Sequence, residues 1–228
     1  MTMKKAKRRR NAEEEAPKPA IDQRYLWLGG IGIVFLLAIV ALVFATRPQT
    51  IDPSIYEGIE VSGSVIGQAD APILVQDYSD FKCPHCRQAS TTLLPDLIEE
   101  YVKAGTIRLE VVPVGSRDES SFAGQAALCA GDQGQFWPYH DVLFEQQEKR
   151  FSIEQLLQFG RDLGLEDQLL RDCILSGKYK GQIDSNLNEF RTIGGTGTPT
   201  FVVDGETLPS GIPSLEALQL LISQKLEE

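Results

Sequence analysis

Two cysteines separated by two residues are the part of this sequence best suited to chemistry. They occur as Cys83-Pro84-His85-Cys86 in a chain of 228 residues that holds four cysteines. Two thiols at this spacing can form a redox-active disulfide, bind a metal or simply be structural. A zinc site needs further ligands at close spacing, but Cys129 and Cys173 are single and far apart. Covalent haem attachment needs His after the second cysteine, where this chain has Arg87. Redox chemistry is therefore favoured, without a metal.

The residues around the pair predict a helix that begins at the first cysteine. A strand pattern over 73–78 precedes the pair, and a helical pattern runs from about 83 to 103. Pro84 suits the first turn, because its missing N–H would have no partner there. The helix N-terminus favours a thiolate at Cys83, and His85 can place positive charge beside it. Cys86, one turn on, is expected to be more buried. A stabilised thiolate favours the reduced pair and makes its disulfide an oxidant.

The remaining patterns predict an α/β domain in which helices interrupt a sheet. A second strand is expected over 107–112 and a long helical block over about 116–191. A strand over 200–203 follows, and Asp204-Gly205 can turn the chain into a further strand over 206–208. Ser152 and Ser214 are suited to cap helices. The predicted order is β-α-β, helical insertion, β-β-α, in a domain over 68–228 that follows a stalk over 47–67.

Three segments together resemble a known family. ILVQDYSDFKCPHCRQ, AALCAGDQGQFWPYHDVLF and GGTGTPTFVVDG are similar to the DsbA-like branch of the thioredoxin superfamily. The similarity is strongest to membrane-anchored thiol–disulfide oxidoreductases with a helical insertion, and it covers about residues 58–228. The resemblance implies a thioredoxin-like fold whose only redox group is the Cys83–Cys86 disulfide, with no other cofactor.

The resemblance also implies roles for single residues. Cys83 matches the exposed attacking cysteine, and Cys86 matches its buried resolving partner. Pro199 matches a cis-proline whose loop faces the dithiol and pairs with the substrate backbone, and Thr198 matches the position that tunes substrate release. Asp77 matches a buried acid that moves the proton of the resolving cysteine, although a solvated carboxylate at the end of a strand is the alternative. Threonine before the proline departs from the best-known oxidase and also occurs in isomerases.

The other two cysteines lie in apolar helical runs. Cys129 occurs in AALCA and Cys173 in LLRDCIL. They could be two buried free thiols, since cysteine packs as a small hydrophobic residue. The resemblance makes their proximity plausible, and in an oxidising compartment close thiols tend to pair, so we hypothesise a structural disulfide. His140 is expected to be a packed or surface helix residue and not a catalytic one.

The amino-terminal region predicts a membrane anchor. Residues 25–46 carry no charge over 22 residues, which is enough for a helix to cross roughly 30 Å of hydrocarbon. Eight basic residues precede this stretch and Arg47 follows it, so residues 1–24 are expected to form a cytoplasmic tail and the domain to be extracytoplasmic. A signal peptide cleaved before Thr46 is the alternative. The net charge is −10 overall, and the part after residue 24 is strongly acidic, which argues against nucleic-acid binding.

These observations favour a dithiol oxidase that gives disulfides to exported proteins with free thiols. The resemblance further implies a membrane partner that restores the oxidised pair, quinone-linked and of the DsbB or vitamin K epoxide reductase kind. A disulfide isomerase or reductase of the same fold is the first alternative. A thioredoxin-like scaffold without catalysis is the second, although a scaffold has no need of the intact dithiol.

Overall fold

The computed structural model describes residues 36–37, 39, 52–115 and 118–228. The chain divides into two compact units, residues 1–47 and 48–228. In the first unit Leu36, Leu37 and Ile39 are helical and exposed. The predicted cytoplasmic tail and all other residues of the predicted anchor lie outside the described residues. Within the described residues, no helix has both the length and the apolar character needed to span a bilayer.

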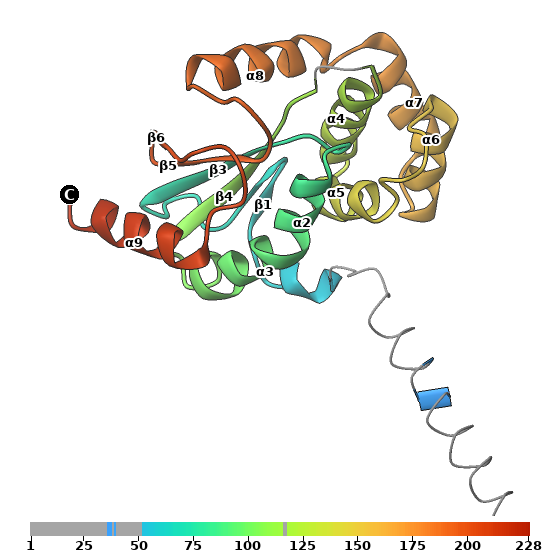
Figure 1. Cartoon of the computed structure of the whole chain (residues 1–228). Coiled ribbons are helices and arrows are strands. Elements are labelled where there is room, and N and C mark those ends of the chain that lie inside the picture. Colours follow the sequence, from blue (N-terminus) through green and yellow to red (C-terminus); the bar gives the residue numbers. More distant parts are fainter. Residues whose placement is uncertain (1–35, 38, 40–51, 116–117) are drawn as a thin grey trace, which may run out of the picture. The chain divides into compact units, whose positions relative to one another are not determined.

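A six-stranded mixed sheet forms the centre of the second unit, in the order β1-β2-β4-β3-β5-β6 (Figure 1). The central strands β3 (Ile73–Ser79) and β4 (Ile107–Pro113) run parallel, as expected for a β-α-β unit. Strand β5 (Thr200–Val203) pairs antiparallel with β3, and β6 (Glu206–Thr207) pairs antiparallel with β5. All four residues of β5 are buried. The strands predicted on both sides of the helical block are therefore confirmed as neighbours in one sheet.

The segment predicted as a stalk contributes two strands to this sheet. After a 3₁₀ turn (η1, Pro53–Tyr56), strands β1 (Val61–Ser62) and β2 (Val65–Ile66) form a hairpin whose second strand pairs antiparallel with β4. The stalk prediction over 47–67 is therefore wrong for the hairpin, and the predicted domain start at residue 68 is too late. Strands of two residues are too short to show an alternating pattern, which explains the error.

The helix after β3 is interrupted where the sequence predicted one continuous helix over 83–103. It consists of α2 (Pro84–Thr92), α3 (Leu94–Leu97) and a π-helical segment, η2 (Ile98–Val102). Pro95 has no N–H for the hydrogen-bond ladder, and the helix is interrupted at Leu93, between α2 and α3. The short α2 therefore presents one amino-terminal turn beside the ends of β3 and β5.

Among the described residues, five helices lie between β4 and β5 and form the insertion. They are α4 (Asp118–Gly131), α5 (Phe136–Glu145), α6 (Ile153–Asp162), α7 (Asp167–Ser176) and α8 (Lys180–Thr192). The Ser152 hydroxyl accepts from the amide of Gln155 at the start of α6, as its sequence context predicted. Ser214 caps α9 (Leu215–Leu226) in the same way. The order β-α-β, helical insertion, β-β-α is confirmed.

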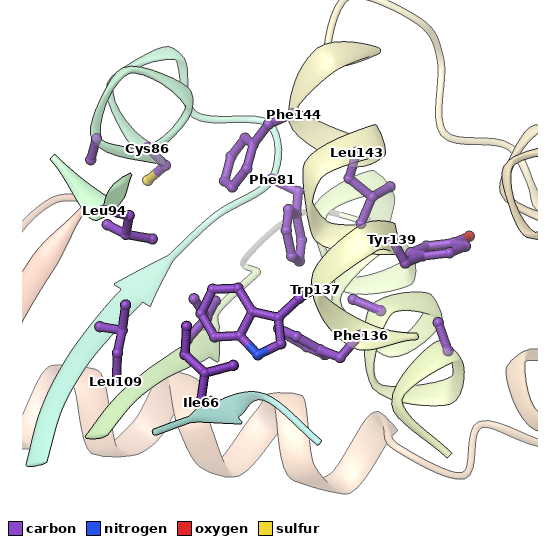
Figure 2. Packing of buried hydrophobic residues seen from close by; sticks show 14 of the residues in the cluster. Ile66, Phe81, Cys86, Leu94, Leu109, Phe136, Trp137, Tyr139, Leu143 and Phe144 are labelled. Carbon is purple, nitrogen blue, oxygen red and sulfur yellow. The ribbon is translucent and has the colours of Figure 1, made fainter. Parts of the chain in front are cut away.

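One hydrophobic core joins the insertion to the sheet. Trp137 and Phe144 of α5 lie in the same cluster as Ile66 of β2, Leu109 of β4 and Cys86 of α2 (Figure 2). All five side chains are at most 1% exposed. Because α2 and α5 share this core, the insertion is packed directly behind the helix that carries the dithiol.

Candidate active site

The dithiol lies where β3 ends and α2 begins. The Cys83 amide donates to the Asp80 carbonyl at 2.9 Å, and Pro84 occupies the first helical turn. Cys83 has extended backbone (φ −89°, ψ 120°) at the N-cap of α2, and its carbonyl accepts from the Arg87 amide. The sequence predicted this placement. It directs the free N–H groups of the first turn, and the positive end of the helix dipole, at the Cys83 sulfur.

Cys83 is half-buried and is a free thiol. The hydrogen bond from the Cys86 side chain is the main reason that its pKa is lowered, to about 5 from 9.0. Partial burial opposes this shift, whereas the Thr198 side chain and the amides of Cys86 and His85 add to it. Cys83 therefore carries a thiolate at neutral pH, the form that attacks and leaves in disulfide exchange.

The Cys86 thiol differs from the Cys83 thiol in both its burial and its pKa. It is fully buried, and burial raises its pKa far above the ordinary range. Its own hydrogen bond to Cys83 and the negative charge of Asp77 raise the pKa further. The Asp80 amide donates to the Cys86 sulfur at 3.4 Å. The pair therefore consists of one thiolate and one protonated thiol, as the sequence predicted for the attacking and resolving positions.

Asp77 of β3 is completely buried, so it is not the solvated carboxylate considered as the alternative. Among the described residues neither of its carboxyl oxygens has a hydrogen-bond partner. Burial raises the pKa of this carboxyl to about 7; the nearby Ser79 opposes the rise and the charge on Cys83 adds to it. An acid close to half-protonated at neutral pH thus lies near Cys86 and can hold or release a proton there.

The loop before β5 brings a distant segment to the dithiol. The Thr198–Pro199 peptide bond is cis, Pro199 is buried, and the Cys83 sulfur lies 3.2 Å from the Thr198 carbonyl oxygen, to which it can donate only when protonated. The Ser210 hydroxyl holds this loop, because it accepts from the Thr196 amide at 3.0 Å and lies 2.8 Å from the Thr200 hydroxyl. Sequence reasoning missed Ser210, whose role depends only on tertiary contacts.

His85 is exposed on the first turn of α2, as is Pro84. The His85 amide is one of the donors that lower the pKa of Cys83. An electrostatic role for its imidazole stays a prediction.

A second missed contact connects the insertion to the dithiol. Gln147, in the loop between α5 and α6, is buried, and its side-chain amide donates to the carbonyls of Phe81 (2.8 Å) and Cys83 (3.0 Å). In return the Lys82 ammonium donates to the carbonyls of Gln147 (2.7 Å) and Lys149 (3.0 Å). These four hydrogen bonds fix the backbone that leads into Cys83. The sequence contains no local signal for them.

Cys129 and Cys173 lie elsewhere and are joined by a disulfide between α4 and α7, with Cα atoms 5.9 Å apart. His140 of α5 is buried, with Nδ1 2.8 Å from a carboxyl oxygen of Asp141 and its ring against Phe144. It is a packed core residue, as expected. Within the part of the chain that the structure describes, no group of three or more His, Cys, Asp or Glu side chains could hold a metal ion.

Comparison with known proteins gives a consistent result. A family model described as Thioredoxin matches residues 60–224. The chain is 25% identical over 214 residues to a probable disulfide bond formation protein D of Bacillus anthracis, covering 88% of this chain and 97% of that protein. The structure of BdbD from Bacillus subtilis is similar in fold, with a TM-score of 0.66, 19% identity and coverage of 73% and 94%. The structure of DsbA from Chlamydia trachomatis is also similar, with a TM-score of 0.63 and 23% identity. The match covers 79% of this chain and 98% of that structure.

Proposed function

Because the chain belongs to the thioredoxin family, as a DsbA-like thiol–disulfide oxidoreductase, we propose that it donates disulfides to exported proteins through Cys83 and Cys86. The observation that carries this proposal is the difference between the two thiols. The pKa of Cys83 is lowered to about 5, whereas that of Cys86 is raised. A stabilised thiolate favours the reduced pair, so the oxidised pair readily passes its disulfide to other thiols.

The reaction begins with the Cys83–Cys86 disulfide. A substrate thiolate attacks the Cys83 sulfur, which breaks the ring, forms a mixed disulfide and releases Cys86 as a thiolate. Because burial strongly disfavours that charge, Cys86 takes up a proton, and the protonated carboxyl of Asp77 is the donor. The carboxylate then regains its proton from solvent.

A second substrate thiolate completes the transfer. It attacks the substrate sulfur of the mixed disulfide, which forms the substrate disulfide and releases Cys83 as a thiolate. The low pKa of Cys83 makes it a good leaving group. Two electrons have then passed from the substrate to the pair. The loop at Thr198 and Pro199 lies against Cys83 and holds the substrate backbone during both steps.

The location and the partner are part of the same proposal. An anchor over residues 25–46, with the basic tail on the cytoplasmic side, would keep the domain among exported proteins. The reduced pair then needs an oxidant at the membrane. A quinone-linked membrane oxidoreductase of the DsbB or vitamin K epoxide reductase kind would take the two electrons and restore the disulfide.

The transfer can be tested directly with a reduced, unfolded protein that has two cysteines. The oxidised full-length chain is mixed with this substrate without oxygen or glutathione, and free thiols are counted on both proteins. We expect one substrate disulfide for each Cys83–Cys86 disulfide consumed, and none with Cys83→Ser. A substrate that stays reduced, together with reduction of substrate disulfides by the reduced chain, would contradict the proposal and favour a reductase.

A further inference from the structure

A small polar pocket lies beside the dithiol, on the side of α2 that faces the insertion. Its volume is about 280 Å³, and it is lined by Pro84, Arg87, Gln88, Thr91, Gln147 and Glu148. Ligand pockets for drug-sized molecules begin at about 300 Å³, so this one suits a single side chain and its backbone. Pro84 directly follows Cys83, so a polypeptide bonded to the Cys83 sulfur has its neighbouring residues within reach of the pocket.

The pocket contains hydrogen-bond donors that the protein does not use. Arg87 is the only cationic residue of the lining, and its guanidinium makes no hydrogen bond to any other described residue. Its nearest carboxyl oxygen belongs to Glu148, at 3.9 Å, which is too long for a hydrogen bond. A guanidinium offers five N–H donors in a planar arrangement that matches a carboxylate, so Arg87 is free to bind one.

Burial makes Arg87 and Glu148 unequal partners. The Arg87 side chain is 26% exposed, whereas that of Glu148 is 88% exposed. An exposed ion pair contributes little, because water and salt screen it and the long side chains lose entropy. Glu145, at the end of α5, also interacts with the charge of Arg87, but it is not part of the lining. A carboxylate that enters the pocket can therefore displace Glu148 at low cost and form two hydrogen bonds to Arg87.

We infer that this pocket is a substrate subsite in which Arg87 binds an acidic side chain a few residues from the reacting cysteine of the substrate. The inference rests on the proposed function, and it adds the class of substrate: unfolded polypeptides with Asp or Glu close to a cysteine. Because Glu148 is negatively charged and lines the pocket, it weakens the binding of an acidic side chain to Arg87 and repels a second acidic residue.

The test uses short peptides with one cysteine and one variable residue, which is Glu, Gln or Lys. The variable residue is placed at each position from three before to three after the cysteine. The rate at which each peptide reduces the oxidised full-length chain is measured at low and at high salt. In the wild type, at one or more positions, we expect the Glu peptide to react several-fold faster than the Gln peptide and the Lys peptide to react more slowly. High salt should reduce the difference.

Variants of the pocket residues test whether Arg87 causes the preference for the Glu peptide. At the preferred position, Arg87→Gln should bring the Glu-to-Gln rate ratio close to one, and Glu148→Gln should increase it. Arg191→Gln is the matched control, because Arg191 is an exposed arginine on α8, and its ratio should equal that of the wild type. A ratio of rates is insensitive to a general change in the reactivity of Cys83.

Two outcomes would overturn the inference in distinguishable ways. Equal rates for the Glu, Gln and Lys peptides at every position, or a ratio unchanged in Arg87→Gln, would eliminate the subsite and leave the proposed function intact. If no peptide reacts, although the dithiol still exchanges with glutathione, the proposed function fails and the subsite fails with it.

Discussion

The two cysteine pairs of this chain occupy opposite ends of helices. Cys83 lies at the N-terminus of α2, whereas Cys129 and Cys173 lie in the last turns of α4 and α7. The helix dipole stabilises negative charge at the first position and disfavours it at the other two. The Asp132 carboxylate, 3.7 Å from the Cys173 sulfur, adds further negative charge there. Helix position therefore distinguishes the pair that we propose to exchange disulfides from the pair that is joined by a disulfide.

The surroundings reinforce this difference. The Cys83 sulfur contacts the Thr198 carbonyl, and a buried acid, Asp77, lies near Cys86. Cys129, in contrast, is 1% exposed within the hydrophobic core and is bonded to Cys173. The Cys129 sulfur is therefore closed to an attacking thiolate, whereas Cys173, like Cys83, is only partly buried. Each pair can be altered separately, and the expected effects differ in kind.

The largest effect is expected at Cys83. Cys83→Ser removes the sulfur that forms the mixed disulfide, so disulfide transfer to a reduced substrate should be lost completely, as measured by thiol counting. Cys86→Ser has no disulfide to donate, but its Cys83 thiolate should attack a substrate that carries a disulfide and remain joined to it, because no resolving thiol is left; the mixed disulfide should be visible as a covalent complex on a non-reducing gel. Transfer that persists in Cys83→Ser would show that the chemistry lies elsewhere.

The second pair should matter for stability and not for transfer. The disulfide joins residues 44 apart, and closing a loop of that size contributes about 4 kcal/mol in the chain-entropy model. The double variant Cys129→Ala/Cys173→Ala should lose most of that unfolding free energy in guanidinium titrations and still oxidise substrates when folded. A double variant that is as stable as the wild type would contradict a structural role.

The buried acid Asp77 should make the free energy of unfolding depend on pH, by about a few kcal/mol. The pKa of Asp77 is about 7 in the folded protein, against an ordinary value of 3.8. Between these values the folded chain keeps a proton that the unfolded chain releases, so stability falls as the pH rises. The unfolding free energy of the reduced wild type, minus that of Asp77→Asn, should decrease between about pH 4 and pH 7 and be flat outside this range. A difference independent of pH would contradict the raised pKa.

The smallest effect is expected at the contact between the insertion and the dithiol. Gln147→Met keeps the volume but removes the donor to the buried Phe81 carbonyl, which should cost about 1–3 kcal/mol of unfolding free energy. The pKa of Cys83, followed by thiolate absorbance, should also move toward its ordinary value as the Cys83 backbone loosens. Gln224→Met is the control, because Gln224 is exposed on α9.

The sequence predicted most of the features that depend on local chemistry. Pro84 and the two cysteines identified the start of α2, and Ser152 and Ser214 identified two further helix starts. These signals are local, because a cap or a first-turn proline acts within a few residues. The positions of Asp77 and Pro199 followed from the resemblance, and the structure places both at the dithiol.

The features that the sequence did not predict depend on contacts between distant segments. The hairpin over 61–66 is too short for a periodic pattern and exists because β2 pairs with β4. Gln147 and Ser210 are ordinary polar residues in loops until the fold brings them to the backbone of Cys83 and of the Pro199 loop. The pocket around Arg87 likewise depends on tertiary structure, because residues of α2 and of the loop after α5 line it together.

The most direct test of the account is the equilibrium reduction potential of the Cys83–Cys86 pair in the full-length chain, measured against glutathione buffers. The low pKa of Cys83 stabilises the reduced form, so we expect a value near the oxidising end of the family range, about −120 mV. Such a value would support a disulfide donor that needs an oxidising partner. A value of about −270 mV would contradict the proposed role as a disulfide donor and identify the chain as a reductase.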